Sequence, residues 1–147
     1  MQRSWWQDPL FWAAAGAAPV FWLGLAVAGW PVVALTWPAH EPQRFLLLVA
    51  VYPVLEEIAF RGGLQPALAS LTDRWPWAGL GLVTLPNVLT SLGFAALHLL
   101  GHAPLWAAAV FVPSLVFGVL RDRHHSVASP IALHVFYNTG YFWLFGR

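Results

Sequence analysis

The sequence predicts an all-α protein that crosses a membrane repeatedly: a polytopic transmembrane helical bundle of about five spans, in one domain over residues 1–147. Of the 147 residues, 59% are hydrophobic and only 9% are charged, whereas soluble domains carry about 25% charged residues. With so few charges the chain cannot cover a surface that faces water. Proline, glycine and short polar clusters divide the apolar sequence into segments of span length. The expected surroundings are a lipid bilayer, and the net charge of +1 gives no indication of a nucleic-acid partner.

The first span is predicted from Pro9 to about Thr36, because Asp8 is a favourable N-cap and proline suits the first helical position. Pro19 and Pro31 are expected to kink this helix. Later spans are expected at residues 45–71 with a bend at Gly62, Gly63 and Pro66, at 77–100 with a break at Pro86, at 104–120, and from 126–130 to Phe145. Loops are expected at residues 37–44, 72–75, 101–103 and 121–125.

All seven basic residues are arginines, and their placement predicts the orientation of the chain. The expected loops put four of them on the side of the N-terminus and two on the other side, and leave Arg61 inside the membrane. Because basic loops favour the cytoplasm, the N-terminus is predicted to be cytoplasmic. The four are Arg3, Arg74, Arg121 and Arg123, and the two are Arg44 and Arg147. Cysteine is absent, which excludes disulfides, thiol catalysis and cysteinyl metal sites.

Three charged residues, Glu56, Glu57 and Arg61, interrupt the apolar second span. A charge at bilayer depth costs several kcal/mol, so such a cluster indicates a functional site; the alternative is a helix end at the water interface. Glu57 and Arg61 are four residues apart with the acid first, which predicts an ion pair on one helix face. Glu56 then points about 100° further round the helix, towards a neighbour.

Two later helices carry further polar residues. His98 follows Phe94 by four residues, and His134 and Asn138 are likewise four apart and share a helix face. A single histidine in an apolar helix is more often a packing residue than a catalyst. Counting residues from the expected turns places these side chains and Glu56 within a band narrower than a membrane. We therefore expect them to converge.

In this order, Glu-Glu-x-x-x-Arg, Phe-x-x-x-His and His-x-x-x-Asn resemble the CAAX prenyl protease and bacteriocin-processing (CPBP, or Abi) family of intramembrane proteases, to which Ras-converting CAAX endopeptidases belong. The resemblance spans residues 56–138, within a motif-bearing core of about 45–145. It implies a glutamate-type intramembrane endopeptidase. In that family the residues matching Glu56 and His98 activate water, and those matching His134 and Asn138 stabilise the oxyanion. Supporting roles fall to Glu57, Arg61 and Phe94.

The chemistry of these side chains agrees with such roles, because peptide hydrolysis needs a base, a proton donor and donors for the oxyanion. In a zinc-dependent version of the same protease, Glu56, His98 and His134 would bind the metal and leave one position open. No His-Glu-x-x-His pair is present, which favours a site without a cofactor. A non-catalytic peptide-binding immunity or scaffold protein and a small transporter are two further hypotheses. The complete set of four side chains disfavours the scaffold, and the lack of internal repeats disfavours the transporter.

The expected substrate is a membrane-anchored protein or peptide, cut near its C-terminal anchor or tail. Nothing in the chain indicates binding of a prenyl group. The short chain, with little beyond the core, is typical of a prokaryotic stand-alone member in the cytoplasmic (inner) membrane. Two more polar residues are interpreted as structural. Asn87 is expected to hydrogen-bond the backbone groups that Pro86 leaves without a partner, and Ser114 is expected to hydrogen-bond a carbonyl of its own helix.

Overall fold

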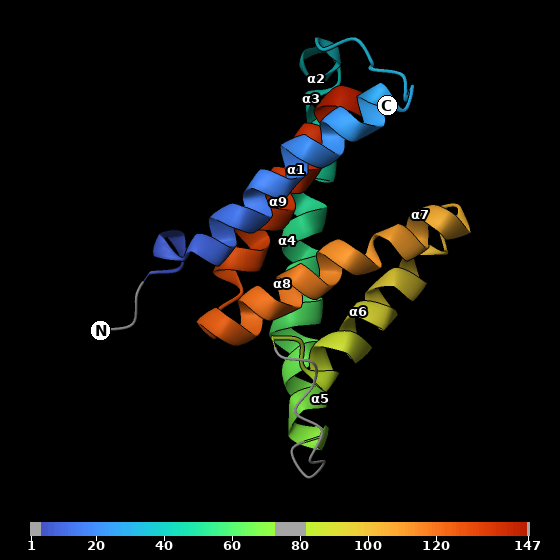
Figure 1. Cartoon of the computed structure of the whole chain (residues 1–147). Coiled ribbons are helices and arrows are strands. Elements are labelled where there is room, and N and C mark those ends of the chain that lie inside the picture. Colours follow the sequence, from blue (N-terminus) through green and yellow to red (C-terminus); the bar gives the residue numbers. More distant parts are fainter. Residues whose placement is uncertain (1–3, 73–81, 147) are drawn as a thin grey trace. The chain divides into compact units, whose positions relative to one another are not determined.

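The computed structural model describes residues 4–72 and 82–146, and these residues confirm the all-α class (Figure 1). Helix accounts for 81% of the structure, and no β-strand occurs within the described ranges. Most of the expected turn at 72–75, the start of the third span, and Arg3, Arg74 and Arg147 lie outside them. Two compact units are distinguished, residues 1–55 with 131–147, and residues 56–130. The single domain stays a prediction.

In the first unit a 3₁₀ turn, η1 (Trp5–Gln7), precedes helix α1 (Pro9–Val27). The predicted N-cap is confirmed, since Asp8 Oδ1 accepts a hydrogen bond from the Leu10 amide at 3.0 Å. The expected extension of this helix to Thr36 is wrong. Gly29 has a φ of +86°, the left-handed conformation in which helices commonly end and which glycine adopts without steric cost.

Short helices occupy the segment predicted as a loop, residues 37–44. They are α2 (Trp37–His40) and α3 (Pro42–Leu46), each with a proline in its first turn. The Trp37 indole is buried and donates to the Phe142 carbonyl at 3.0 Å. Because this segment is tied to the end of the last helix, it is ordered as helix instead of running free between spans.

The second predicted span is helical and continuous from Pro42 to Thr72, but two of its segments have π-helical geometry. After α3 come η2 (Leu47–Val51, π), α4 (Tyr52–Glu57), η3 (Ile58–Leu64, π) and α5 (Gln65–Thr72). The bend expected at Gly62, Gly63 and Pro66 therefore takes the form of a widened turn, which is a common accommodation of proline within a helix.

In the second unit α6 (Leu85–His98) begins with Thr84 as its N-cap, whose hydroxyl accepts from the Asn87 amide at 3.3 Å. Pro86 lies in the first turn, where proline is tolerated. Because residues 77–81 lie outside the described ranges, the break of the third span at Pro86 stays a prediction. Helices α7 (Pro104–Ala109) and α8 (Phe111–His124) follow. The loop expected at residues 121–125 is wrong, because α8 continues to His124 and ends where His125 turns left-handed, with a φ of +50°.

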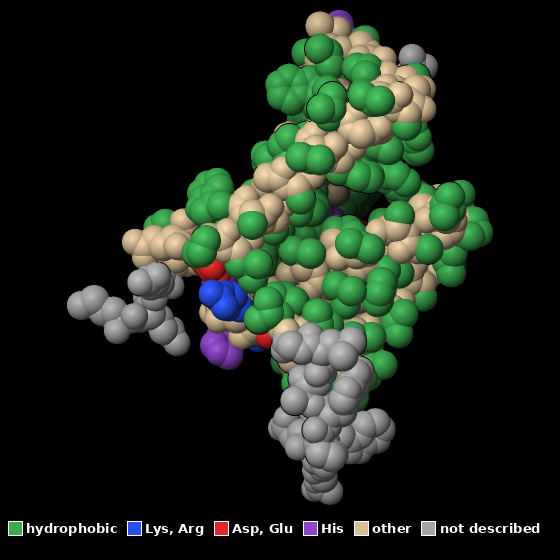
Figure 2. Space-filling view, viewed as in Figure 1, with side chains coloured by type: hydrophobic (Ala, Val, Ile, Leu, Met, Phe, Trp, Pro, Cys, Tyr) green, Lys and Arg blue, Asp and Glu red, His purple; other side chains and the backbone are tan. Residues whose placement is uncertain are grey.

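The last helix, α9 (Ala128–Phe145), belongs mainly to the first unit and agrees with the prediction. By length and composition, two helices among the described residues qualify as membrane spans: Pro9–Val27, which is α1, and Pro104–His124, which joins α7 and α8. Hydrophobic side chains are spread widely over the visible surface, and few charged side chains appear on it (Figure 2). On α1 they include the exposed Trp12, Val20, Phe21, Leu23 and Val27. Helices of this kind indicate a membrane protein, whereas the count of five spans is not confirmed.

Candidate active site

Arg61 lies at the centre of a buried polar cluster in the second unit. Its side chain has no exposed surface, and neither has that of Glu57. Arg61 Nη1 donates to Glu57 Oε1 at 3.2 Å, which confirms the ion pair predicted from their spacing. Arg61 Nη2 donates to the Ser114 carbonyl at 2.9 Å and to the Ser114 hydroxyl. One guanidinium therefore joins η3, where Arg61 lies, to α8.

Aromatic rings enclose the rest of the Arg61 guanidinium. The rings of Phe94, Phe117 and Phe60 have their centroids 4.8, 5.5 and 6.0 Å from its central carbon. A cation over aromatic faces is attracted by their quadrupoles, and this attraction strengthens when water is excluded. Phe94, which the sequence predicted as a supporting residue, is 2% exposed. It thus seals the ion pair from one side.

Further buried polar residues extend the cluster along α8. Asn87 donates to the Leu115 carbonyl at 3.0 Å and accepts from the Ser91 hydroxyl at 3.2 Å. The interpretation of Asn87 as a patch for its own backbone is therefore wrong, because it ties α6 to α8. Ser114 likewise accepts from Arg61 instead of serving only its own helix.

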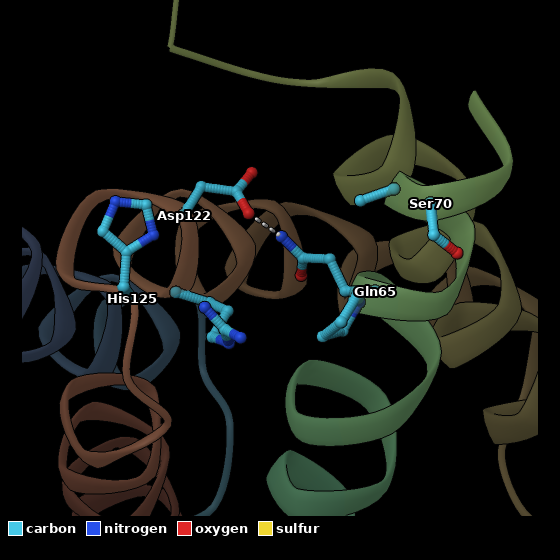
Figure 3. A pocket seen from close by; sticks show the side chains of 7 residues that line it. Gln65, Ser70, Asp122 and His125 are labelled. Carbon is cyan, nitrogen blue, oxygen red and sulfur yellow. Dashed lines mark hydrogen bonds between the residues drawn. The ribbon is translucent and has the colours of Figure 1, made fainter. Parts of the chain in front are cut away.

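Asp122 closes the same network near the end of α8. Its two carboxylate oxygens accept from Gln65 Nε2 at 2.7 Å and from the Thr84 hydroxyl at 2.8 Å. Gln65 also donates to the Gly118 carbonyl at 3.1 Å. A cleft of about 500 Å³ opens here (Figure 3), in which the Gln65 amide points to Asp122 while Ser70 and His125 lie to either side. The residues that line it are Gln65, Pro66, Ala69, Ser70, Arg121, Asp122 and His125.

His98 is the last residue of α6 and is half-buried. Its Nδ1 lies 2.8 Å from the Phe94 carbonyl oxygen. A carbonyl oxygen only accepts, so Nδ1 carries the hydrogen, and the neutral ring keeps its lone pair on Nε2. The ring packs against Phe94 with 4.5 Å between centroids, and exposed His102 stacks on it at 5.7 Å. This geometry equips His98 Nε2 to accept a proton or to bind a metal.

Glu56 is the half-buried neighbour of fully buried Glu57 at the end of α4. Consecutive residues of a helix point about 100° apart, so Glu56 does not share the direction of the ion pair. The second unit thus holds two of the four predicted catalytic residues, Glu56 and His98. It also holds all three predicted supporting residues, Glu57, Arg61 and Phe94.

The remaining two predicted catalytic residues, His134 and Asn138, lie on α9 in the first unit. His134 is 6% exposed. Asn138 Nδ2 donates to the Leu48 carbonyl of η2 at 3.0 Å, which uses one of its two hydrogens. One turn of α9 separates the two residues, so they share a helix face as predicted. The convergence of this pair with Glu56 and His98 stays a prediction.

The zinc-dependent version draws on both units, since it needs Glu56 and His98 from one and His134 from the other. Over residues 4–72 and 82–146, no group of three or more His, Asp or Glu side chains is placed to hold a metal ion. The nitrogen that a metal would need on His98, Nε2, is the same one that a general base would use. That the site works without zinc, with His98 as a base, therefore stays a prediction.

Sequence reasoning missed most of the network around Arg61. Gln65, Thr84 and Asp122 carried no motif, and their partners lie in helices 38–57 residues away along the chain. One signal in the sequence was the position of Gln65 one helical turn after Arg61, in a stretch otherwise poor in polar side chains.

Comparison with known proteins identifies the family of the chain. The sequence matches the family described as Type II CAAX prenyl endopeptidase Rce1-like over residues 38–140, which is well over half of its length. No curated protein and no solved structure gives a match. The matched range contains the motif residues of the second unit and the His134–Asn138 pair of α9. Those of the second unit are Glu56, Glu57, Arg61, Phe94 and His98. The chain therefore belongs to the Rce1-like family of type II CAAX prenyl endopeptidases.

Proposed function

We propose that the chain is a glutamate-type intramembrane endopeptidase, which hydrolyses a peptide bond of a membrane-associated protein near its C-terminal anchor or tail. Family membership implies an integral membrane protease, and the match over residues 38–140 is the observation that carries the proposal. The hydrogen bond of His98 to the Phe94 carbonyl supports it, because it leaves Nε2 as the basic nitrogen.

In the proposed reaction Glu56 and His98 activate a water molecule. The carboxylate of Glu56 takes a proton as the water oxygen bonds to the scissile carbonyl carbon, and the carbonyl π electrons move onto its oxygen. His98 Nε2 accepts the other hydrogen of the water in a hydrogen bond and orients it. When the carbon–nitrogen bond breaks, the proton held by Glu56 passes to the leaving nitrogen, so that a carboxylic acid and an amine are formed.

His134 and Asn138 stabilise the oxyanion in this proposal. His134 donates a ring N–H, and Asn138 donates the Nδ2 hydrogen that is not engaged by Leu48. Loss of a single donor of this kind costs about 10²–10³ in kcat. Glu57 and Arg61 do not take part in the chemistry: they form an ion pair inside the second unit, and Arg61 holds η3 against α8.

The membrane arrangement is part of the proposal. Helix α1, the run Pro42–Thr72, α6, the pair α7–α8 and α9 are proposed as five spans, with the N-terminus in the cytoplasm of a prokaryotic cell. The 14 residues of α6 cover about 21 Å, less than the bilayer core of about 30 Å. The third span was predicted from residue 77, and its residues 77–81 lie outside the described ranges. No cofactor is proposed, and the substrate need not carry the prenyl group of the family name.

The test is cleavage by the purified protein in liposomes. The probes are peptides with a fluorophore and a quencher on either side of a cleavable stretch, tethered by a transmembrane segment in one set and by a C-terminal prenyl group in another. We expect turnover of at least one set by the unaltered protein and none by Glu56→Gln. Glu41→Gln is the matched control, because it makes the same chemical change at an exposed carboxylate. Equal turnover by Glu56→Gln and the unaltered protein would rule out the glutamate mechanism.

The same assay distinguishes the zinc-dependent version of the protease from the mechanism without a metal. We expect that a strong chelator leaves turnover unchanged. The zinc-dependent version predicts instead that the chelator abolishes activity, that added zinc restores it, and that His134→Ala is inactive even with zinc. This outcome would make Glu56, His98 and His134 metal ligands. Binding of the probe without cleavage by any protein sample would support the peptide-binding scaffold.

A further inference from the structure

Each π segment of the helical run Pro42–Thr72 is followed by a proline, and each leaves one backbone carbonyl without a helical partner. In η2 the Tyr52 amide donates to the Leu47 carbonyl, five residues back, instead of the Leu48 carbonyl, four residues back. The next π partner of the Leu48 carbonyl would be the amide of residue 53, and Pro53 has no N–H. This carbonyl accepts instead from Asn138 Nδ2 at 3.0 Å.

The second π segment repeats the arrangement. In η3 the Gln65 amide donates to the Phe60 carbonyl, five residues back, and so leaves the Arg61 carbonyl. The next π partner of that carbonyl would be the amide of residue 66, which is again a proline. The Arg61 carbonyl accepts instead from Arg121 Nε at 3.0 Å. Both carbonyls thus stand five residues before a proline, and each binds a side chain from a distant helix.

These two bonds explain why the widened turns persist. A buried carbonyl without a partner costs free energy, and within a membrane no water is available to supply one. In an ordinary α-helix the carbonyls of Leu48 and Arg61 would be satisfied by the amides of Tyr52 and Gln65. The π register removes those partners, the prolines prevent replacement at the next position, and the side chains of Asn138 and Arg121 complete the hydrogen bonding.

We propose that Pro53 and Pro66 are positioning residues: Pro53 fixes the Asn138 carboxamide through the Leu48 carbonyl, and Pro66 fixes Arg121 through the Arg61 carbonyl. The consequence for catalysis rests on the proposed function. The hydrogen bond from one Nδ2 hydrogen to the Leu48 carbonyl fixes the plane of the Asn138 carboxamide. Because the amide is planar, the direction of the second Nδ2 hydrogen is then fixed as well. That direction is what an oxyanion donor needs, because its effect depends on alignment established before the reaction.

The first test is a double-mutant cycle. Pro53→Ala supplies an amide hydrogen that competes with Asn138 for the Leu48 carbonyl, so we expect kcat to fall at least about tenfold, towards the 10²–10³ of a lost donor, with KM nearly unchanged. In an Asn138→Ala background the same substitution should have no further effect on kcat. Pro66→Ala is the matched control: it should change kcat by the same factor with and without Asn138. Equal effects of Pro53→Ala in both backgrounds would overturn the proposal.

The second test needs no activity and therefore distinguishes a failure of this inference from a failure of the proposed function. Asn87 and Asn138 are the only asparagines in the sequence. Protein labelled with ¹⁵N-asparagine in detergent micelles gives two side-chain amide groups, and Asn138→Ala assigns them. We expect the Asn138 group to shift in Pro53→Ala and to stay in place in Pro66→Ala. If Pro53→Ala does not fold, the unaltered protein still decides: one Asn138 side-chain hydrogen must exchange slowly with deuterium, and rapid exchange of both overturns the proposal.

Discussion

Replacement of Arg61 by methionine should strongly destabilise the second unit. Methionine fills part of the same space but leaves the Glu57 carboxylate, which has no exposed surface, without its cationic partner. It also removes the two hydrogen bonds to Ser114. Removal of one member of a buried ion pair costs about 3–5 kcal/mol, because the remaining charge stays in a medium that solvates it poorly. A loss of that size is a large part of the stability of a small domain.

A second substitution should restore much of the loss. When Glu57→Gln is combined with Arg61→Met, neither charge remains, and replacement of both members of a buried pair is often close to neutral. We therefore expect the double variant to be more stable than Arg61→Met alone, although it carries one more substitution. The interaction free energy of the cycle then measures the pair itself.

The assay is unfolding in detergent micelles, followed by tryptophan fluorescence. Arg44→Met is the matched control, because Arg44 pairs with Glu41 at a similar distance of 3.1 Å, while the two side chains are 50% and 53% exposed. Exposed pairs contribute about 0–1 kcal/mol. If Arg61→Met is no less stable than Arg44→Met, or if the double variant is the least stable of all, then Glu57 and Arg61 do not form a dry pair and the reasoning is refuted.

Two glycines provide further predictions, measured by the same unfolding assay. Gly118→Ala should cost about 1–3 kcal/mol, because its new Cβ would overlap the side-chain amide of Asn87, which is held by hydrogen bonds on both sides. Gly140→Ala should cost a similar amount, because its Cβ would overlap the ring of Trp22 on α1, and an unchanged midpoint would mean that α1 and α9 are not in contact there. Gly16→Ala is the control for both: apart from its chain neighbours and the backbone of its own helix, no atom of the described residues lies within 4 Å of the position its Cβ would take, so the better helix propensity of alanine should leave stability equal or higher.

The features that could be predicted from the sequence are those that depend on one helix alone. The Glu57–Arg61 pair follows from a spacing of four residues, since helix geometry brings such side chains together whatever surrounds them. The N-cap at Asp8 is equally local. The end of α1 is local too, because Gly29 followed by Pro31 is a common termination signal. The prediction of a longer helix failed because the residues beyond Gly29 are as apolar as those before it, and hydropathy alone does not mark where a helix ends.

The features that could not be predicted depend on contacts between helices. Asn87 and Ser114 each have an ordinary local explanation, and only the packing of α6 and η3 on α8 reveals their actual partners. Asp122 falls in a predicted loop because polar residues at the end of a span usually face water. In the structure both of its oxygens are engaged by Gln65 and Thr84, which keep α8 helical beyond the expected end.

The hydrogen bonds from Asn138 and Arg121 to the Leu48 and Arg61 carbonyls could be predicted only in part. The acceptor follows from one helix alone, whereas the donor depends on contacts between helices. A proline in a helix removes one amide donor, and that loss can be read from any sequence. The carbonyl five residues earlier is freed only where the helix also widens to the π register, and such widening persists only if another group satisfies that carbonyl. A buried Asn or Arg on another helix is the side chain most able to do so, because its N–H groups are otherwise costly to bury. In a membrane protein a proline within a charged span therefore predicts an acceptor, and the polar residues of the other spans are the candidate donors.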